Sequence, residues 1–211
     1  NTTSSNTYSG YTYNASGQTT NYTRTDKDAS GNTTRSYDYS GYTYNASGQT
    51  TNYTRTDKDA SGNTTAAYNY SGYTYYDTGR TQSYNTTATD ASGNTTATYN
   101  YNYNSSGQLS NYTNNTYSNG QVTNTYTYSG YTYNANGQTT SYTRTDTNAS
   151  GNTTASYNYS GYTYNAGGQT TAYTIKSNDG QGSFSYWYDY SNRNFNTSGS
   201  LTSYDWVRKD Q

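Results

Sequence analysis

The sequence predicts an all-β protein, an antiparallel β-meander built from about six 31-residue Tyr-rich repeats, each a hairpin unit. Three observations predict it: tyrosine supplies 34 of 211 residues while aliphatic residues are scarce, long segments recur at a fixed spacing, and glycine-closed turns punctuate them. One Ile, two Leu and two Val cannot build an aliphatic core, so tyrosine rings must pack on a sheet surface. A spiralling sheet, a flat sheet and a closed barrel or solenoid all remain open.

The repeat is clearest near the amino terminus, where residues 13–34 recur unchanged at 44–65, a shift of 31. Degraded copies begin at Tyr75, Tyr103, Tyr133 and Tyr164. The segments between turns are rich in Thr and Tyr and show no helical spacing of apolar residues, which favours strands.

Four-residue segments of the Asn-Ala-Ser-Gly and Asp-Ala-Ser-Gly type predict the turns, because Asn or Asp first and Gly fourth suit a type I turn closed by a left-handed glycine. A chain reversal at each predicts about thirteen or fourteen strands of roughly ten residues. The segments end at Gly17, Gly31, Gly48, Gly62, Gly93, Gly107, Gly120, Gly137, Gly151 and Gly168.

The octet YDYSGYTY at 37–44 interrupts a Tyr alternation with Ser40-Gly41. The Ser-Gly-Tyr triplet is absent from YNYNY at 99–103, yet the next turn follows at the expected spacing. If the triplet were a turn, losing it would reverse the direction of the chain downstream. We therefore predict a β-bulge in one continuous strand, with a two-residue turn as the alternative. The bulge would project four rings from one face: Tyr37, Tyr39, Tyr42 and Tyr44.

The segment Tyr-Asn-x-x-Gly-Gln, which starts at Tyr13, Tyr44, Tyr103 and Tyr133, resembles the YD repeats of RHS-type bacterial surface proteins and toxins, as does YYDTGR at 75–80. The resemblance covers about residues 1–175 and implies a secreted bacterial architecture of antiparallel strands that spiral into shells. Here Asn mostly replaces the usual Asp and Thr the usual Leu, and no segment resembles the autocleaving core of that family. The resemblance therefore carries over no toxin payload.

The repeat decays late in the chain, which predicts a Tyr-rich β-repeat domain at 1–175 and a divergent cap or subunit-joining segment at 176–211. We predict an assembly interface in the second segment, with the strand that starts at Asn1 as its counterpart. Its candidate residues are Phe184, Trp187, Tyr204, Trp206 and Val207.

Charge and composition limit the classes of partner and the cellular location that we expect. Eleven Lys and Arg nearly balance twelve Asp, which argues against nucleic acid as a partner, and no apolar run approaches the roughly 20 residues that membrane insertion needs. Because the chain starts at Asn1 without Met or a leader, we expect a secreted, extracellular or cell-surface protein whose signal peptide has been removed. The expected partners are copies of the chain itself and glycans.

The function that we expect is an extracellular structural subunit that self-assembles into a fibre, sheath or matrix. The alternative is a monomeric adhesin or carbohydrate-binding repeat domain in which tyrosine rings stack on sugars. The chain has no His, Cys or Glu, so we expect no enzyme, no catalytic residue and no organic cofactor.

Two segments resemble calcium loops in the spacing of their oxygen ligands, at positions one, three and five ahead of a glycine. No acidic residue follows at the twelfth position, and turn formation alone also explains these residue types. The candidate calcium ligands are Asp26, Asp28, Ser30, Asp57, Asp59 and Ser61.

Asn-x-Ser/Thr triplets are frequent and make N-glycosylation a further expectation. The candidate sites are Asn14, Asn21, Asn32, Asn45, Asn52, Asn63, Asn94, Asn148 and Asn152.

Overall fold

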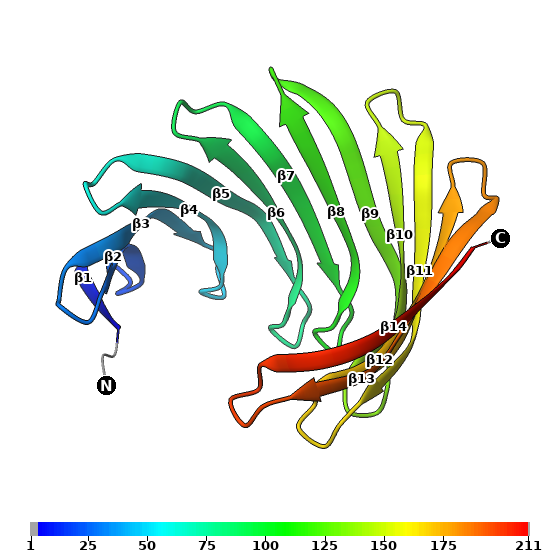
Figure 1. Cartoon of the computed structure of the whole chain (residues 1–211). Helices are drawn as coiled ribbons and strands as arrows, with labels where there is room; N and C mark the ends of the chain where they lie inside the picture. The colour runs from blue at the N-terminus through cyan, green and yellow to red at the C-terminus, as the bar shows by residue number, and fades with distance from the viewer. Residues whose placement is uncertain (1–3, 211) are drawn as a thin grey trace. The chain divides into compact units, whose positions relative to one another are not determined.

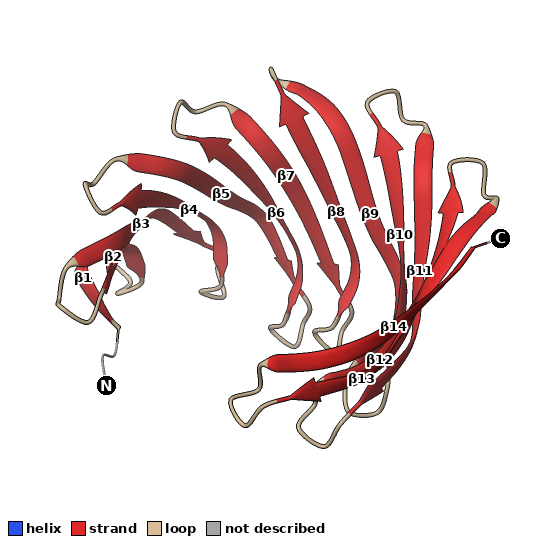
Figure 2. Cartoon of the chain, viewed as in Figure 1, coloured by secondary structure: helices blue, strands red, loops and turns tan. Residues whose placement is uncertain are grey.

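The structure, a computed structural model, describes residues 4–210, so the predicted role of Asn1 lies outside the described residues. Within that range fourteen strands form one antiparallel sheet in chain order (Figure 1). The order runs from β1 to β14, so each of these two strands has a single hydrogen-bonded neighbour and the sheet does not close. The predicted all-β meander is confirmed. The ribbon of the described residues contains strands and loops only (Figure 2), so none of its segments is a helix able to cross a membrane.

The strands are β1 (Ser5–Tyr13), β2 (Thr19–Lys27), β3 (Thr33–Tyr44), β4 (Thr50–Asp59), β5 (Thr64–Tyr75), β6 (Thr81–Asp90), β7 (Thr95–Tyr103), β8 (Leu109–Ser118), β9 (Gln121–Tyr133), β10 (Thr139–Asn148), β11 (Thr153–Tyr164), β12 (Thr170–Asp179), β13 (Phe184–Phe195) and β14 (Leu201–Asp210).

The chain divides into two compact units, one up to Gly107 together with Thr116–Gln121, the other Gln108–Asn115 together with the residues from Val122 onward. Both follow one local plan. Odd-numbered strands carry the Ser-Gly octets, except that β7 lacks the triplet and β13 has Ser191-Asn192-Arg193 in its place. Even-numbered strands carry the segments of the TTNYTRTDK type.

The predicted hairpin turns are confirmed, as the first one illustrates. The Gly17 N–H donates to the Asn14 carbonyl at 3.0 Å, and Gly17 has φ +77°, in the left-handed region that favours glycine. The Asn14 side-chain oxygen accepts hydrogen bonds from the N–H groups of Ser16 at 3.0 Å and Gln18 at 2.9 Å. Asn at the first position thus satisfies backbone donors that the turn leaves free.

One turn differs from the prediction. β8 ends at Ser118 and β9 begins at Gln121, with φ of 51° at Asn119 and 74° at Gly120. Both central residues are left-handed, as in a two-residue type I′ hairpin, for which Asn-Gly is the preferred dipeptide. Three further turns of the four-residue type end at Gly79, Gly182 and Gly199.

The bulge at Ser40-Gly41 is confirmed, since β3 runs unbroken through it. In the pairing with β4, Ser40 lies opposite Thr54 and Thr43 opposite Asn52, so β3 has one extra residue there. Gly41 takes φ +66°, and the equivalent glycines are Gly10, Gly72, Gly130 and Gly161, with φ between 64° and 66°. β13 has the same bulge, with Asn192 at φ 48° in place of glycine.

The sheet has almost no interior. Within residues 4–210 the buried residues are Thr86, Ala88, Ala97 and Ser177. Packing therefore takes place between neighbouring side chains on the faces of the sheet. The strands continue without a break past residue 175, while the domain division there stays a prediction from the sequence.

Candidate functional site

The bulge gives an inner odd strand such as β3 one tyrosine for each of its two neighbours. Tyr39, before the bulge, stacks on Tyr22 of β2, with ring centroids 4.5 Å apart and planes inclined by 10°. Tyr42, after the bulge, stacks on Tyr53 of β4 at 4.8 Å and 7°. Without the extra residue, three steps along the strand would place these two rings on opposite faces. We call the face that carries them and their equivalents the tyrosine face.

An inner even strand such as β4 places one ring between two others. Tyr53 lies 4.8 Å from Tyr42 and 4.4 Å from Tyr70, and its ring planes are inclined by 7° and 10° to theirs. The ring faces therefore cover one another. Burial raises the pKa of the Tyr53 and Tyr70 phenols, and it raises the pKa of Tyr159 to about 12.

A second row on the tyrosine face alternates arginine with tyrosine. The Arg55 guanidinium carbon lies 5.7 Å from the ring centroid of Tyr37 and 4.4 Å from that of Tyr68. Its Nε donates to one Asp57 carboxylate oxygen at 2.6 Å and its terminal nitrogen to the other at 2.9 Å. These two hydrogen bonds fix the orientation of the guanidinium plane, and the two faces of the guanidinium remain available to the tyrosine rings.

This pairing was not predicted, although the sequence contains a signal for it. Arg-x-Asp occurs at 24–26, 55–57, 144–146 and 208–210, and each pair is hydrogen-bonded. The matching positions of β6 hold Thr86 and Ala88, so both charges are absent together. Joint presence or absence at a spacing of two residues is the pattern that a same-face ion pair leaves in a strand.

The calcium candidates divide between two structural roles. Asp26 pairs with Arg24, whereas one Asp28 carboxylate oxygen accepts hydrogen bonds from the N–H groups of Ser30 at 2.8 Å and Asn32 at 2.9 Å. The Asn32 N–H is the main cause of an Asp28 pKa below its usual range. Asp57, Asp59 and Ser61 repeat this arrangement. No cluster of three or more His, Cys, Asp or Glu occurs in residues 4–210, and the calcium site stays a prediction.

The glycosylation candidates lie at turns and beside bulges, and most are exposed. Glycosylation takes place at the side-chain amide nitrogen. That nitrogen donates to a Gln side chain from Asn14 and Asn45, to a Thr hydroxyl from Asn21 and Asn52, and to an Asp carboxylate from Asn32, Asn63 and Asn94. The Asn148 oxygen accepts from the N–H of Asn152. A glycan would compete with the first seven bonds, and glycosylation stays a prediction.

Tyrosine hydroxyls form hydrogen bonds beyond the point where the backbone hydrogen-bond ladder between an even strand and the next odd strand ends. The pairing of β2 with β3 ends at Tyr22 opposite Tyr39. Beyond it, the Tyr44 hydroxyl donates to the Thr19 carbonyl at 2.6 Å. Tyr133 likewise donates to the Leu109 carbonyl at 2.6 Å. The last tyrosine of the octet therefore ties two strands together past the end of their ladder.

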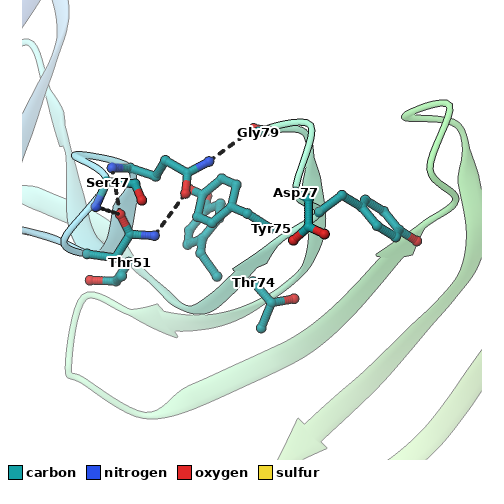
Figure 3. A pocket seen from close by; sticks show the side chains of 10 residues that line it. Ser47, Thr51, Thr74, Tyr75, Asp77 and Gly79 are labelled. Atoms are coloured by element: carbon teal, nitrogen blue, oxygen red, sulfur yellow. Dashed lines mark hydrogen bonds between the residues drawn. The ribbon is translucent and has the colours of Figure 1, made fainter.

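An open groove lies between successive turns on one side of the sheet (Figure 3). It has a volume of about 540 Å³ and is lined by turn and strand residues including Ser47, Tyr75 and Asp77. The Gln49 side chain crosses to the next turn and donates to the Gly79 carbonyl at 3.2 Å. The groove offers amides, hydroxyls and a carboxylate for hydrogen bonding, and the glutamine after the turn serves as a bridge between repeats.

The exposed large apolar side chains lie on the two edge strands. Among the described residues they are Tyr8, Tyr11, Tyr13, Leu201, Tyr204, Trp206 and Val207, with exposed fractions of 41% to 60%. All belong to β1 or β14.

The predicted assembly residues do not form one patch. Tyr204 and Trp206 lie on the tyrosine face of β14, whereas Val207 lies on the opposite face, as the alternation of side chains requires. Trp187 on β13 is half-buried, 5.6 Å from the Phe184 ring and between the ammonium groups of Lys176 and Lys209. Tyr204, Trp206 and Val207 are therefore the accessible members of the set.

No family model matches the chain, and no curated protein matches it. Among solved structures, the chain is similar to the crystal structure of TcdB2-TccC3 without its hypervariable C-terminal region, at 19% identity and a TM-score of 0.37. The match covers 95% of this chain and 13% of that chain, so this chain spans a small part of it. The Tyr-rich repeating strand pattern is a property of this structure, while membership of the YD-repeat family stays a prediction from the motif.

Proposed function

We propose that this chain is an extracellular structural protein whose copies join through their edge strands into a fibre, sheath or matrix. One observation carries the proposal: the exposed large apolar side chains of the described residues all lie on β1 and β14. Equivalent tyrosines of inner strands, such as Tyr22 and Tyr39, are half-buried against their neighbours. The edge strands thus display surface that the rest of the sheet covers.

Of the two edges, β1 lacks the common protections against pairing, whereas β14 carries Asp205, Arg208, Lys209 and Asp210. β1 carries no charged residue, and the chain contains no proline. Proline and charged side chains are the usual means by which natural sheets prevent edge-to-edge association. Stacking on sugars, which the adhesin alternative requires, would need open ring faces, and rings such as Tyr53 have both faces against other rings.

Sedimentation velocity over a range of concentrations, with negative-stain electron microscopy, tests the proposal. We expect the 23.3 kDa chain to convert into larger species as concentration rises. Deleting residues 201–211 is expected to abolish these species while circular dichroism still reports the remaining strands. A chain that sediments as a monomer throughout and binds sugars on a glycan array would overturn the proposal in favour of the adhesin.

A further inference from the structure

We infer that copies join head to tail, with β14 of one copy pairing antiparallel to β1 of the next in the register that even and odd strands use inside the chain. This inference rests on the proposed function and specifies its joint. The occupant of each free edge is a second copy of this chain. The joint is heterologous, so repeated use of it generates chains of copies rather than closed pairs.

The two edges are complementary in type. β14 is an even strand: Tyr204, Trp206 and Lys209 occupy the places of Tyr53, Arg55 and Lys58. β1 is an odd strand with the bulge at Gly10. Inside the chain, an even strand pairs with the odd strand that follows it in β2·β3, β4·β5, β6·β7, β10·β11 and β12·β13. A β14·β1 joint would repeat this pairing.

The internal register predicts which residues meet. Tyr53 lies opposite Tyr70 and Thr54 opposite Asn69. The equivalent positions place Tyr204 opposite Tyr8 and Asp205 opposite Thr7.

Stacking supplies the first specific contact. In the five internal pairs the two tyrosines at this position lie 4.4 to 4.7 Å apart. Tyr8 is 51% exposed and its ring is tilted by 45° at 6.2 Å from Tyr22, and Tyr204 is 49% exposed. Each of these two rings therefore has an open side where an inner ring has a stacked neighbour.

A hydrogen bond supplies the second specific contact of the joint. At the next position the Thr23 hydroxyl donates to the Asp38 carboxylate at 2.7 Å, and Thr174 donates to Asp189 at the same distance. The joint would bring together Asp205 and Thr7, the same two residue types with the strands exchanged. Asn192 donates to one Asp205 carboxylate oxygen, and the other can accept the Thr7 hydroxyl.

The last tyrosine of the octet supplies the third specific contact of the joint. Tyr44 and Tyr133 donate their hydroxyls to the carbonyl of the first residue of the preceding even strand, which is Thr19 or Leu109. Tyr13 is the equivalent tyrosine of β1 and is 60% exposed. In the joint its acceptor would be the carbonyl of Leu201, the first residue of β14.

Disulfide trapping tests the register, since the chain has no cysteine of its own. In the double variant Thr7→Cys and Asp205→Cys, mild oxidation is expected to give a ladder of covalent dimers, trimers and longer species. The matched control, Thr7→Cys with Trp206→Cys, puts the two thiols on opposite faces and is expected to give none. Tyr204→Ala is expected to weaken association about tenfold by removing roughly 1.4 kcal/mol of ring contact, and Tyr204→Phe to leave it nearly unchanged.

The outcomes separate the joint from the function. If the unmodified chain assembles but the 7–205 pair does not cross-link, or if Asp205→Cys alone yields covalent dimers through two copies of β14, the inferred joint is wrong and the proposed function stands. If the unmodified chain stays monomeric at every concentration, both are wrong. A cross-linked ladder from the 7–205 pair alone supports both.

Discussion

Gly41 shows how one backbone conformation maintains the tyrosine face. It has φ +66°, and a Cβ placed there would meet nothing within 4 Å, so the cost of a side chain is conformational rather than steric crowding. We expect Gly41→Ala to lower the free energy of unfolding by about 1 to 2 kcal/mol. Gly41→Asn is expected to cost less, because Asn192 already occupies the equivalent position of β13 at φ 48°. Urea unfolding of both variants measures the difference, and equal costs would contradict the explanation.

The Arg144–Asp146 pair permits a double-mutant cycle. The side chains are 27% and 14% exposed and their atoms lie 2.7 Å apart. Arg144→Thr leaves a largely covered carboxylate without its guanidinium, and we expect a loss of about 1 to 2 kcal/mol. Adding Asp146→Ala, which reproduces the Thr86 and Ala88 of β6, is expected to restore part of that loss in urea unfolding. A double variant less stable than Arg144→Thr would contradict the pairing.

At the scale of the element, the hydroxyl of Tyr44 closes the gap beyond the β2·β3 ladder. Tyr44→Phe removes the donor to the Thr19 carbonyl and is expected to cost about 0.5 to 1.5 kcal/mol. Hydrogen exchange should then quicken at the adjoining ends of β2 and β3. Tyr13→Phe is the matched control, because Tyr13 lies at the free edge, and it is expected to leave monomer stability unchanged. Equal effects of the two substitutions would exclude the role assigned to Tyr44.

The sequence predicts those elements whose cause is local. Four-residue turns and the Ser40-Gly41 bulge follow from the backbone preferences of Gly, Asn and Asp, and both are confirmed. The bulge of β13 was missed because Asn192 replaces glycine and Arg193 replaces tyrosine there. The Arg55–Asp57 pair was not predicted, because the pair positions the guanidinium between tyrosine rings of two neighbouring strands. Only the strand register brings those rings together.

For the whole molecule, the covered phenols predict sensitivity to alkali. Burial raises the pKa of Tyr159 to about 12 and raises the pKa of Tyr53 and Tyr70, whereas the phenols of an unfolded chain titrate near about 10. Their contribution to stability is therefore complete below about pH 10 and is lost as pH rises from there toward about 12. Tyrosinate absorbance and circular dichroism should change together in that interval. Ionisation of all tyrosines near pH 10 with the sheet intact would contradict this prediction.

The central claim is that one extra residue at Ser40-Gly41 directs two rings of β3 to the same face, each toward a different neighbouring strand. Ring-to-ring nuclear Overhauser contacts in a protein with selectively protonated tyrosines test it most directly. We predict contacts of Tyr39 with Tyr22 and of Tyr42 with Tyr53, whose centroids lie 4.5 and 4.8 Å apart. Absence of both contacts, together with backbone contacts typical of a chain reversal at Ser40-Gly41, would contradict the claim.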